Sequence, residues 1–190
     1  KLIMSKALIT RNALAASLKE LTATNLFDKI TIADITGNLG LNRQTFYYHF
    51  ADKLELLYWI YDSEAFVITC DLTINNWGEK LNLFLKHLRS DKMFYVNTIK
   101  CSKEYFEQYL DKTLEELFKR AAIELDENNE LDENETVLVA KFMSKGLTGV
   151  IIEWIRDGMK ENEDDITSIS LKLVENTKRV VYKQYVKENK

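Results

Sequence analysis

Apolar residues recur at helical spacing along most of the chain. In residues 5–21 they lie at Ala7, Leu14, Leu18 and Leu21, while charged side chains occupy other faces. Intervals of three, four and seven residues are typical of an amphipathic α-helix. The same spacing returns through the rest of the sequence, so we predict an all-α fold.

Three polar residues mark the starts of further helices. Thr31, Asn42 and Asp52 each precede a helical pattern, and each carries a side-chain oxygen that can accept a backbone N–H of the first turn. Asp34, three residues after Thr31, completes the pattern of a capping box. Gly40 can adopt a positive φ, so we expect it to end the first of these helices in a tight turn.

The helical pattern continues towards the C-terminus. We expect Gly78 to interrupt it, and Asp91 and Ser102 to open two separate helices. The acidic run at 126–135 has the composition of a loop, but it lacks the glycine and the spacing of a calcium-binding EF-hand. Two last helices are predicted over residues 137–159 and 166–186.

The composition agrees with long helices and adds few candidate sites. Proline is absent from the 190 residues, which favours uninterrupted helices.

No apolar run approaches the length of about 20 residues that a membrane span requires. We also find no secretory leader, and we expect a cytoplasmic protein without membrane contact, with Met4 as a plausible natural start. Cys70 and Cys101 have neither a disulfide-scaffold nor a zinc-binding spacing.

The charge is unevenly distributed along the chain. The net charge is −4, yet residues 1–53 carry a net +3 and residues 54–190 a net −7. Such asymmetry points to a small nucleic-acid-binding module attached to a body with another role.

The first part of the chain has the pattern of a helix-turn-helix. A short capped helix, a turn containing glycine and a second short helix make up this motif, whose second helix fits the major groove of DNA. Phe46 and Phe50, four residues apart, are expected to face inward. The side chains left outside all carry hydrogen-bond donors: Arg43, Gln44, Thr45, Tyr47, Tyr48 and His49.

The stretch ITIADITGNLGLNRQTFYYHFADKLELL, residues 30–57, is similar to the signature of TetR-family transcription regulators. The resemblance implies base contacts by Arg43, Gln44 and Tyr47. It also implies contacts to the DNA backbone by Thr31, Thr45, Tyr48, His49 and Lys53. Ala33 departs from the family pattern, since some members carry a base-contacting residue there.

A second resemblance concerns the penultimate predicted helix. Its Phe142, Gly146, Gly149, Trp154, Ile155 and Gly158 resemble the TetR subgroup that regulates dihydroxyacetone kinase genes. The family implies a DNA-binding domain over residues 1–50 and a ligand- or partner-sensing and dimerisation domain over residues 51–190. It implies a palindromic operator in double-stranded DNA and a homodimer. The subgroup implies activation controlled by a partner protein.

The last two predicted helices carry apolar stripes suited to a four-helix dimer interface. The expected interface residues are Leu147, Val150, Ile151, Trp154, Leu171, Val174, Val181 and Tyr185. Gly146 and Gly149 would permit close approach of a second chain. The alternative is that these stripes face the core of their own chain.

Aromatic residues of the middle segment are candidates for an effector pocket, with a plain core as the alternative. They are Trp59, Phe66, Tyr95, Tyr105, Phe106, Tyr109 and Phe142. A small-molecule effector or a co-regulator protein is the expected signal.

An enzyme is not expected, because the chain lacks a phosphate-binding loop and the common hydrolase motifs. No cofactor and no metal site is expected either. Of the two histidines, His87 has no acidic or cysteine partner nearby in the sequence, and we interpret it as structural. A helical adaptor that binds only proteins remains the rival class.

Overall fold

The computed structural model describes residues 6–125 and 131–188, with the side chains at 66–68, 125 and 176–188 left out. All secondary structure in these residues is helical, which confirms the predicted all-α class. The elements are α1 (Lys6–Thr22), η1 (Phe27–Lys29), α2 (Ile32–Gly37), α3 (Arg43–His49), α4 (Lys53–Thr69), α5 (Trp77–Ser90), α6 (Lys92–Leu125), α7 (Glu133–Arg156) and α8 (Glu163–Glu188).

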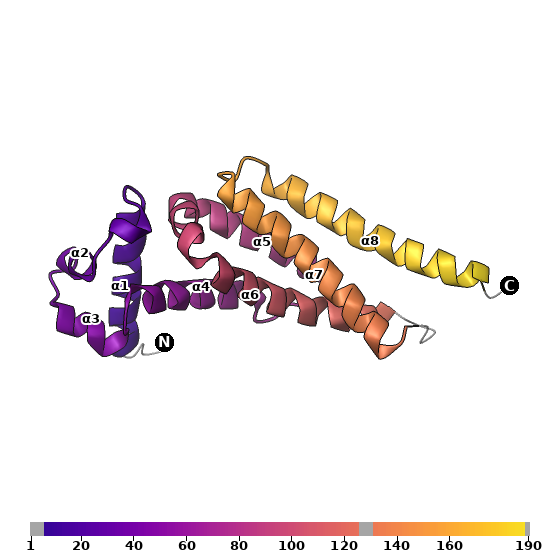
Figure 1. The fold of residues 1–190 in the computed structure, drawn as a ribbon, viewed down its shortest axis with the longest axis horizontal. Coiled ribbons are helices and arrows are strands. Elements are labelled where there is room, and N and C mark those ends of the chain that lie inside the picture. Colours follow the sequence, from indigo (N-terminus) through magenta and orange to yellow (C-terminus); the bar gives the residue numbers. More distant parts are fainter. Residues whose placement is uncertain (1–5, 126–130, 189–190) are drawn as a thin grey trace.

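Helices α1 to α3 form a small unit at one end of the molecule, here called the head (Figure 1). The predicted caps are confirmed. Thr31 and Asp34 form a complete capping box at α2, the Asn42 side chain accepts from the Thr45 N–H at 2.9 Å, and Asp52 accepts from the first N–H groups of α4 at 2.8 Å. Because these oxygens satisfy otherwise unpaired N–H groups, they fix where each short helix begins.

Helix α4 leaves the head and runs into the remaining helices, here called the body (Figure 1). It contacts α1 on one side and α5 and α6 on the other. Its buried side chains, among them Leu56, Leu57 and Ile60, join a continuous hydrophobic core that reaches from α1 to α7. The head and the body are therefore joined by packing as well as by the chain.

Helical segments follow Asp91 and Ser102 as expected, and they meet at a kink within α6, where Ser102 has a non-helical φ of −134°. The buried Tyr61 hydroxyl of α4 is 2.7 Å from Thr98 Oγ1 and 2.9 Å from Ser102 Oγ. This hydroxyl cluster ties the kink to α4.

Gly78 does not interrupt a helix as expected; it lies in the first turn of α5. A Cβ at this position would lie 2.8 Å from the Leu171 Cδ2 of α8. The glycine therefore allows α8 to pack closely on α5, while α7 packs along α6. None of the described helices combines the length and apolar character needed to cross a membrane.

Candidate nucleic-acid interface

Helix α3 has one buried and one exposed side, as predicted. Phe46 and Phe50 are buried in the core, with ring centroids 5.9 Å apart. Tyr47 is 57% exposed and Tyr48 is 83% exposed. Large aromatic side chains this open to solvent cost hydrophobic free energy, so their exposure favours a binding surface.

The turn before α3 sets the angle between α2 and α3 within the head. Gly40 has φ +65°, in the left-handed region that suits glycine. The Leu41 N–H donates to the Thr36 carbonyl at 2.9 Å, closing the turn. At the other end of α3, the Arg11 guanidinium donates to the His49 carbonyl at 3.3 Å and lies 5.2 Å from the centre of the Phe50 ring.

Residues expected at base edges lie together on the outer side of α3. Arg43 and Gln44 are exposed in its first turn, and Tyr47 lies one turn further along. Arginine pairs best with guanine and glutamine with adenine in the major groove. The exposed surface therefore presents the donor groups that direct base recognition uses.

Four of the residues expected at DNA phosphates differ in how free their donors are. The Tyr48 side chain is exposed to solvent, whereas His49 is half-buried with its ring edge-on to the Tyr48 ring. The Thr31 hydroxyl donates to the Asp34 carboxylate at 2.7 Å, and the Thr45 hydroxyl donates to Asn42 Oδ1 at 3.1 Å. Either threonine must turn its hydroxyl to reach a phosphate.

Lys53 is placed differently from the expectation. Its ammonium donates to the carbonyls of Phe27 and Ile30 at 2.9 Å and of Asp28 at 3.3 Å, and lies 4.6 Å from the centre of the Phe27 ring. Its three donors are therefore directed at the backbone around η1 instead of towards solvent. The structure assigns Lys53 to holding the head together.

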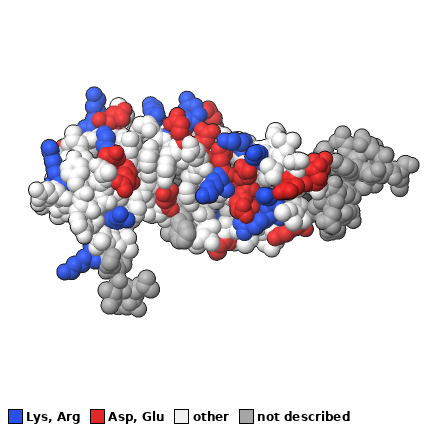
Figure 2. All heavy atoms as spheres, turned by 60° about the horizontal axis from the view of Figure 1, so that its bottom comes forward, with Lys and Arg blue, Asp and Glu red and all other residues white. Residues whose placement is uncertain are grey.

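The head carries acidic as well as basic groups. Hydrogen bonds from the Thr31 hydroxyl and from its N–H, together with the nearby Arg43 charge, hold the pKa of Asp34 below its ordinary value despite a small opposing effect of burial. On the face drawn in Figure 2, basic and acidic side chains are interspersed over both the head at the left and the body. We therefore expect base and phosphate contacts to depend on individual side chains more than on a strongly positive field.

The expected dimer residues differ in how far they are buried within the protomer. Leu147, Ile151 and Trp154 are buried in their own protomer, with Trp154 only 3% exposed and its indole N–H donating to the Glu161 carbonyl at 3.0 Å. Their burial fits the alternative that these stripes face the core of their own chain, and their place in a dimer interface stays a prediction. Val150 is exposed as expected.

The remaining expected dimer residues lie on α8. Leu171 and Val174 are half-buried and pack against the core beside Gly78 of α5, so they belong mainly to the protomer. Val181 and Tyr185 lie outside the residues whose side chains are described.

Sequence reasoning missed the apolar side chains that α7 and α8 leave open. On α7 these are Leu138 and Phe142, the latter 77% exposed, and on α8 they are Ile169 and Leu173. Their signal is present in the sequence as a second set of apolar positions four residues apart. The buried set on the same helix obscured it, since periodicity alone does not say which stripe faces the core.

Aromatic residues expected to line one effector pocket are dispersed. Tyr95 and Phe106 are buried in the core, whereas Phe142 is exposed on α7. Their assignment to an effector pocket stays a prediction. Tyr105 and Tyr109 line an open groove of about 640 Å³ between α4 and α6, with Asp62 and Arg120.

Two other hollows lie near the same helices. Trp59 lines a separate hollow of about 350 Å³ beside α1. The apolar cavity lined by Leu110, Leu147 and neighbouring side chains measures about 40 Å³. Phe66 falls outside the described side chains.

His87 has acidic partners that the sequence did not reveal. Its Nε2 is 2.9 Å from Glu64 Oε2, and the Tyr95 hydroxyl donates to the same carboxylate oxygen at 2.6 Å. Burial alone would raise the pKa of Glu64, but hydrogen bonds from His87, Lys19 and Tyr95 outweigh it and lower the pKa to about 2. His87 has no acidic partner nearby in the sequence, but the fold brings Glu64 beside it.

Comparison with known proteins gives one family match. Residues 75–176, just over half of the chain, match the TetR-type family model described as "Transcriptional regulator C-terminal region". A curated relative, the HTH-type dhaKLM operon transcriptional activator DhaS of Lactococcus lactis, is 30% identical over 119 residues. The match covers 58% of this chain and 64% of the relative, so the chain spans less than two thirds of that relative's length.

Solved structures with the same fold cover most of the chain. A structure of the dihydroxyacetone kinase operon activator DhaS has a TM-score of 0.75 at 23% identity, covering 90% of this chain and 97% of its own. A TetR transcriptional regulator from Streptococcus agalactiae has a TM-score of 0.60 at 21% identity, with 89% and 95% coverage. The fatty acid degradation regulator FadR from Bacillus halodurans has a TM-score of 0.63 at 15% identity, with 86% and 93% coverage.

Proposed function

The chain belongs to the TetR family of transcriptional regulators, and on that premise we propose that it binds a palindromic operator in duplex DNA as a homodimer. The observation that carries this proposal is α3, a short helix anchored by the buried Phe46 and presenting Arg43, Gln44 and Tyr47 to solvent. A helix of this kind can enter the major groove.

Base and backbone contacts are assigned to different side chains of α3. Arg43 and Gln44 can form bidentate hydrogen bonds to base edges, and Tyr47 lies beside them. Tyr48 and His49 are proposed to contact phosphates, since they lie further along the helix and retain donors. Thr31 and Thr45 join them if their hydroxyls turn away from Asp34 and Asn42.

Dimer formation is supported by the open apolar side chains of α7 and α8. Leu138 and Phe142 on α7, and Ile169 and Leu173 on α8, are exposed in the protomer. An added Cβ at Gly146 or Gly149 would meet nothing within 4 Å, so a second chain has room to approach α7. A two-fold pair of heads is what a palindromic operator requires.

A second, more specific candidate function follows from the relatives. The DhaS proteins are described as activators of a dihydroxyacetone kinase operon. We propose that this chain acts on a similar operon, with a co-regulator protein as its signal. The apolar cavity lined by Leu110 and Leu147 measures only about 40 Å³, well below the range of about 300–1,000 Å³ usual for small-molecule pockets. The open groove of about 640 Å³ lined by Tyr105 and Tyr109 lies within that range, so a small-molecule signal is the alternative.

Operator selection from a randomised oligonucleotide pool, at stated salt concentration, tests the main proposal. We expect a palindrome whose half-sites lie about one helical turn, ~34 Å, or a multiple of it apart. Enrichment of no sequence, together with salt-independent binding, would rule the proposal out and favour a protein-binding adaptor. Because an operator is part of chromosomal DNA, the proposed function also places the chain in the cytoplasm.

A further inference from the structure

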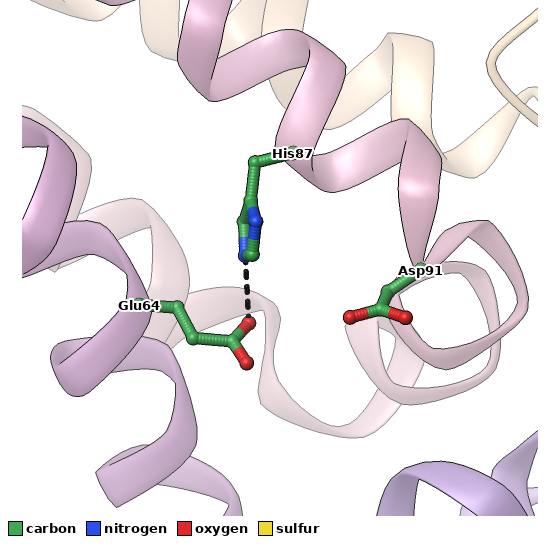
Figure 3. Close-up of side chains that lie close together, drawn as sticks. All are labelled: Glu64, His87 and Asp91. Atoms are coloured by element: carbon green, nitrogen blue, oxygen red, sulfur yellow. Dashed lines mark hydrogen bonds and ion pairs between the residues drawn. The ribbon is translucent and has the colours of Figure 1, made fainter.

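Three helices contribute to a cluster of charged side chains between the head and the body. Glu64 comes from α4, His87 from α5 and Asp91 from the end of α5, and their side chains point towards one another (Figure 3). Lys19 of α1 contributes the cation: its ammonium contacts the Glu64 carboxylate and lies 2.5 Å from Asp91 Oδ2. All four side chains are partly shielded from solvent.

This set of donors matches the preferences of a divalent transition metal. One ligand atom from each of Glu64, His87 and Asp91 lies within 4.8 Å of the other two. Imidazole nitrogen and carboxylate oxygen are common zinc ligands, at about 2.0–2.2 Å from the ion. Small rotations of the three side chains would bring their ligand atoms to that distance.

The surroundings of the cluster also suit a metal site. Tyr95 donates a hydrogen bond to Glu64 at 2.6 Å, the kind of outer contact that orients ligating carboxylates in metal proteins. The neighbouring hollow of about 350 Å³ is lined by Lys19, Glu64 and His87. It provides an entry route and room for a water molecule as a fourth ligand.

We propose that Glu64, His87 and Asp91 form a binding site for a divalent transition-metal ion of the zinc class, which competes with the Lys19 ammonium for the same carboxylates. Two carboxylates face a single ammonium in this cluster, so a divalent cation can take the place of that ammonium. A divalent ion bound to both carboxylates displaces the ammonium, because the two cations cannot occupy the same place.

Displacement of Lys19 has a structural consequence. Lys19 belongs to α1 of the head, whereas the three ligands belong to α4 and α5. Metal binding thus removes an ion pair that joins the head to the body. The effect on DNA rests on the proposed function, while metal binding itself does not.

Calorimetric titration of the full chain with ZnCl₂, after removal of metal with EDTA, tests the site. We expect one ion per chain, about tenfold or greater loss of affinity in His87→Gln, and tighter binding in Lys19→Met, where the competing cation is gone. His49→Gln is the matched control for zinc binding, because His49 is the other histidine of the chain and lies in α3.

Two outcomes would overturn the proposal. One is the absence of submillimolar zinc binding in both the wild type and Lys19→Met, with circular dichroism showing both to be folded. The other is equal zinc affinity in the wild type and His87→Gln. Asp91→Asn, which keeps the lysine, repeats the ligand test if Lys19→Met fails to fold.

A DNA titration with and without zinc separates this inference from the proposed function. We expect zinc to change operator affinity in the wild type and to leave it unchanged in His87→Gln. Absence of operator binding both with and without zinc would refute the proposed function, whereas the calorimetric result would still decide the metal site.

Discussion

Neighbouring side chains on α3 have opposite roles, and single residues therefore decide recognition. Phe46 is fully buried and holds the helix on the head, while Tyr47 is largely exposed beside Arg43 and Gln44. Lys53, only a few residues further on, points back at the carbonyls around η1. We therefore expect the set of DNA-contacting residues to be smaller than the set of polar residues in the motif.

Arg43→Ala and Gln44→Ala should each weaken operator binding by roughly 1–3 kcal/mol and relax the preference at one base position. The reason is loss of a bidentate contact to a base edge. Fluorescence anisotropy with the selected operator and single-base variants measures both effects. Lys100→Ala, an exposed change on α6, controls for lost charge. Unchanged base preference in Arg43→Ala would contradict direct readout by this residue.

Lys53→Met should lower the free energy of unfolding by roughly 1–3 kcal/mol, because the carbonyls of Phe27 and Ile30 lose a charged donor. Operator affinity should fall alike for all sequences as the head loosens. The salt dependence of binding is decisive here. A slope unchanged from the wild type supports the structural role, whereas a slope reduced by about one would indicate a phosphate contact instead.

At the scale of helices, sequence predicts boundaries better than orientation. Thr31, Asn42 and Asp52 were identifiable as caps because capping depends on local spacing. Ser102 likewise marks a boundary, because its non-helical backbone forms the kink of α6, and its hydroxyl lies 2.9 Å from the Tyr61 hydroxyl of α4.

Orientation and long-range contact were beyond local reasoning. Helix α7 carries apolar residues on two faces, so its period fits either burial of Trp154 or burial of Phe142, and only packing on α6 selects Trp154. Likewise, the contact between Lys19 and Asp91 spans 72 residues of sequence. Helix α3 could be predicted from the sequence because its buried and exposed sides differ sharply in chemistry.

The contacts of Glu64, which join α4 to Lys19 of α1 and His87 of α5, are sensitive to acid. Its pKa is about 2 in the folded chain, below its ordinary value of 4.5. The stabilisation is therefore fully present above about pH 4.5 and is lost as the pH falls towards 2. Urea unfolding of wild type and Glu64→Gln should give free energies that differ above about pH 4.5 and converge as the pH falls towards 2. Glu104→Gln on α6 is the matched control, and a constant difference would contradict this assignment.

The whole molecule is organised around α4, with the head at one end and the open apolar side chains of α7 and α8 in the body (Figure 1). Leu147 and Trp154 help to hold the body together from inside, while Phe142 is available outside. Substitutions on the two faces of α7 should therefore have different effects on assembly and stability.

Phe142→Glu should separate the dimer, because it places a charge on an apolar surface of α7 that we propose to be covered. Sedimentation velocity should show a folded monomer with weaker operator binding. Leu26→Glu, at an exposed apolar position of the head, should remain dimeric. By contrast, Trp154→Ala should cost about 3–5 kcal/mol of stability. A dimer that survives Phe142→Glu unchanged would exclude this surface.

The length of α4 turns small motions in the body into large ones at the DNA. Its 17 residues make a lever of about 25 Å, so a tilt of about 5° would displace the head by ~2 Å. Two heads moving apart would change their separation by ~4 Å, slightly more than the ~3.4 Å rise between base pairs. The operator's spacer length would then act as a ruler for the angle of a single helix.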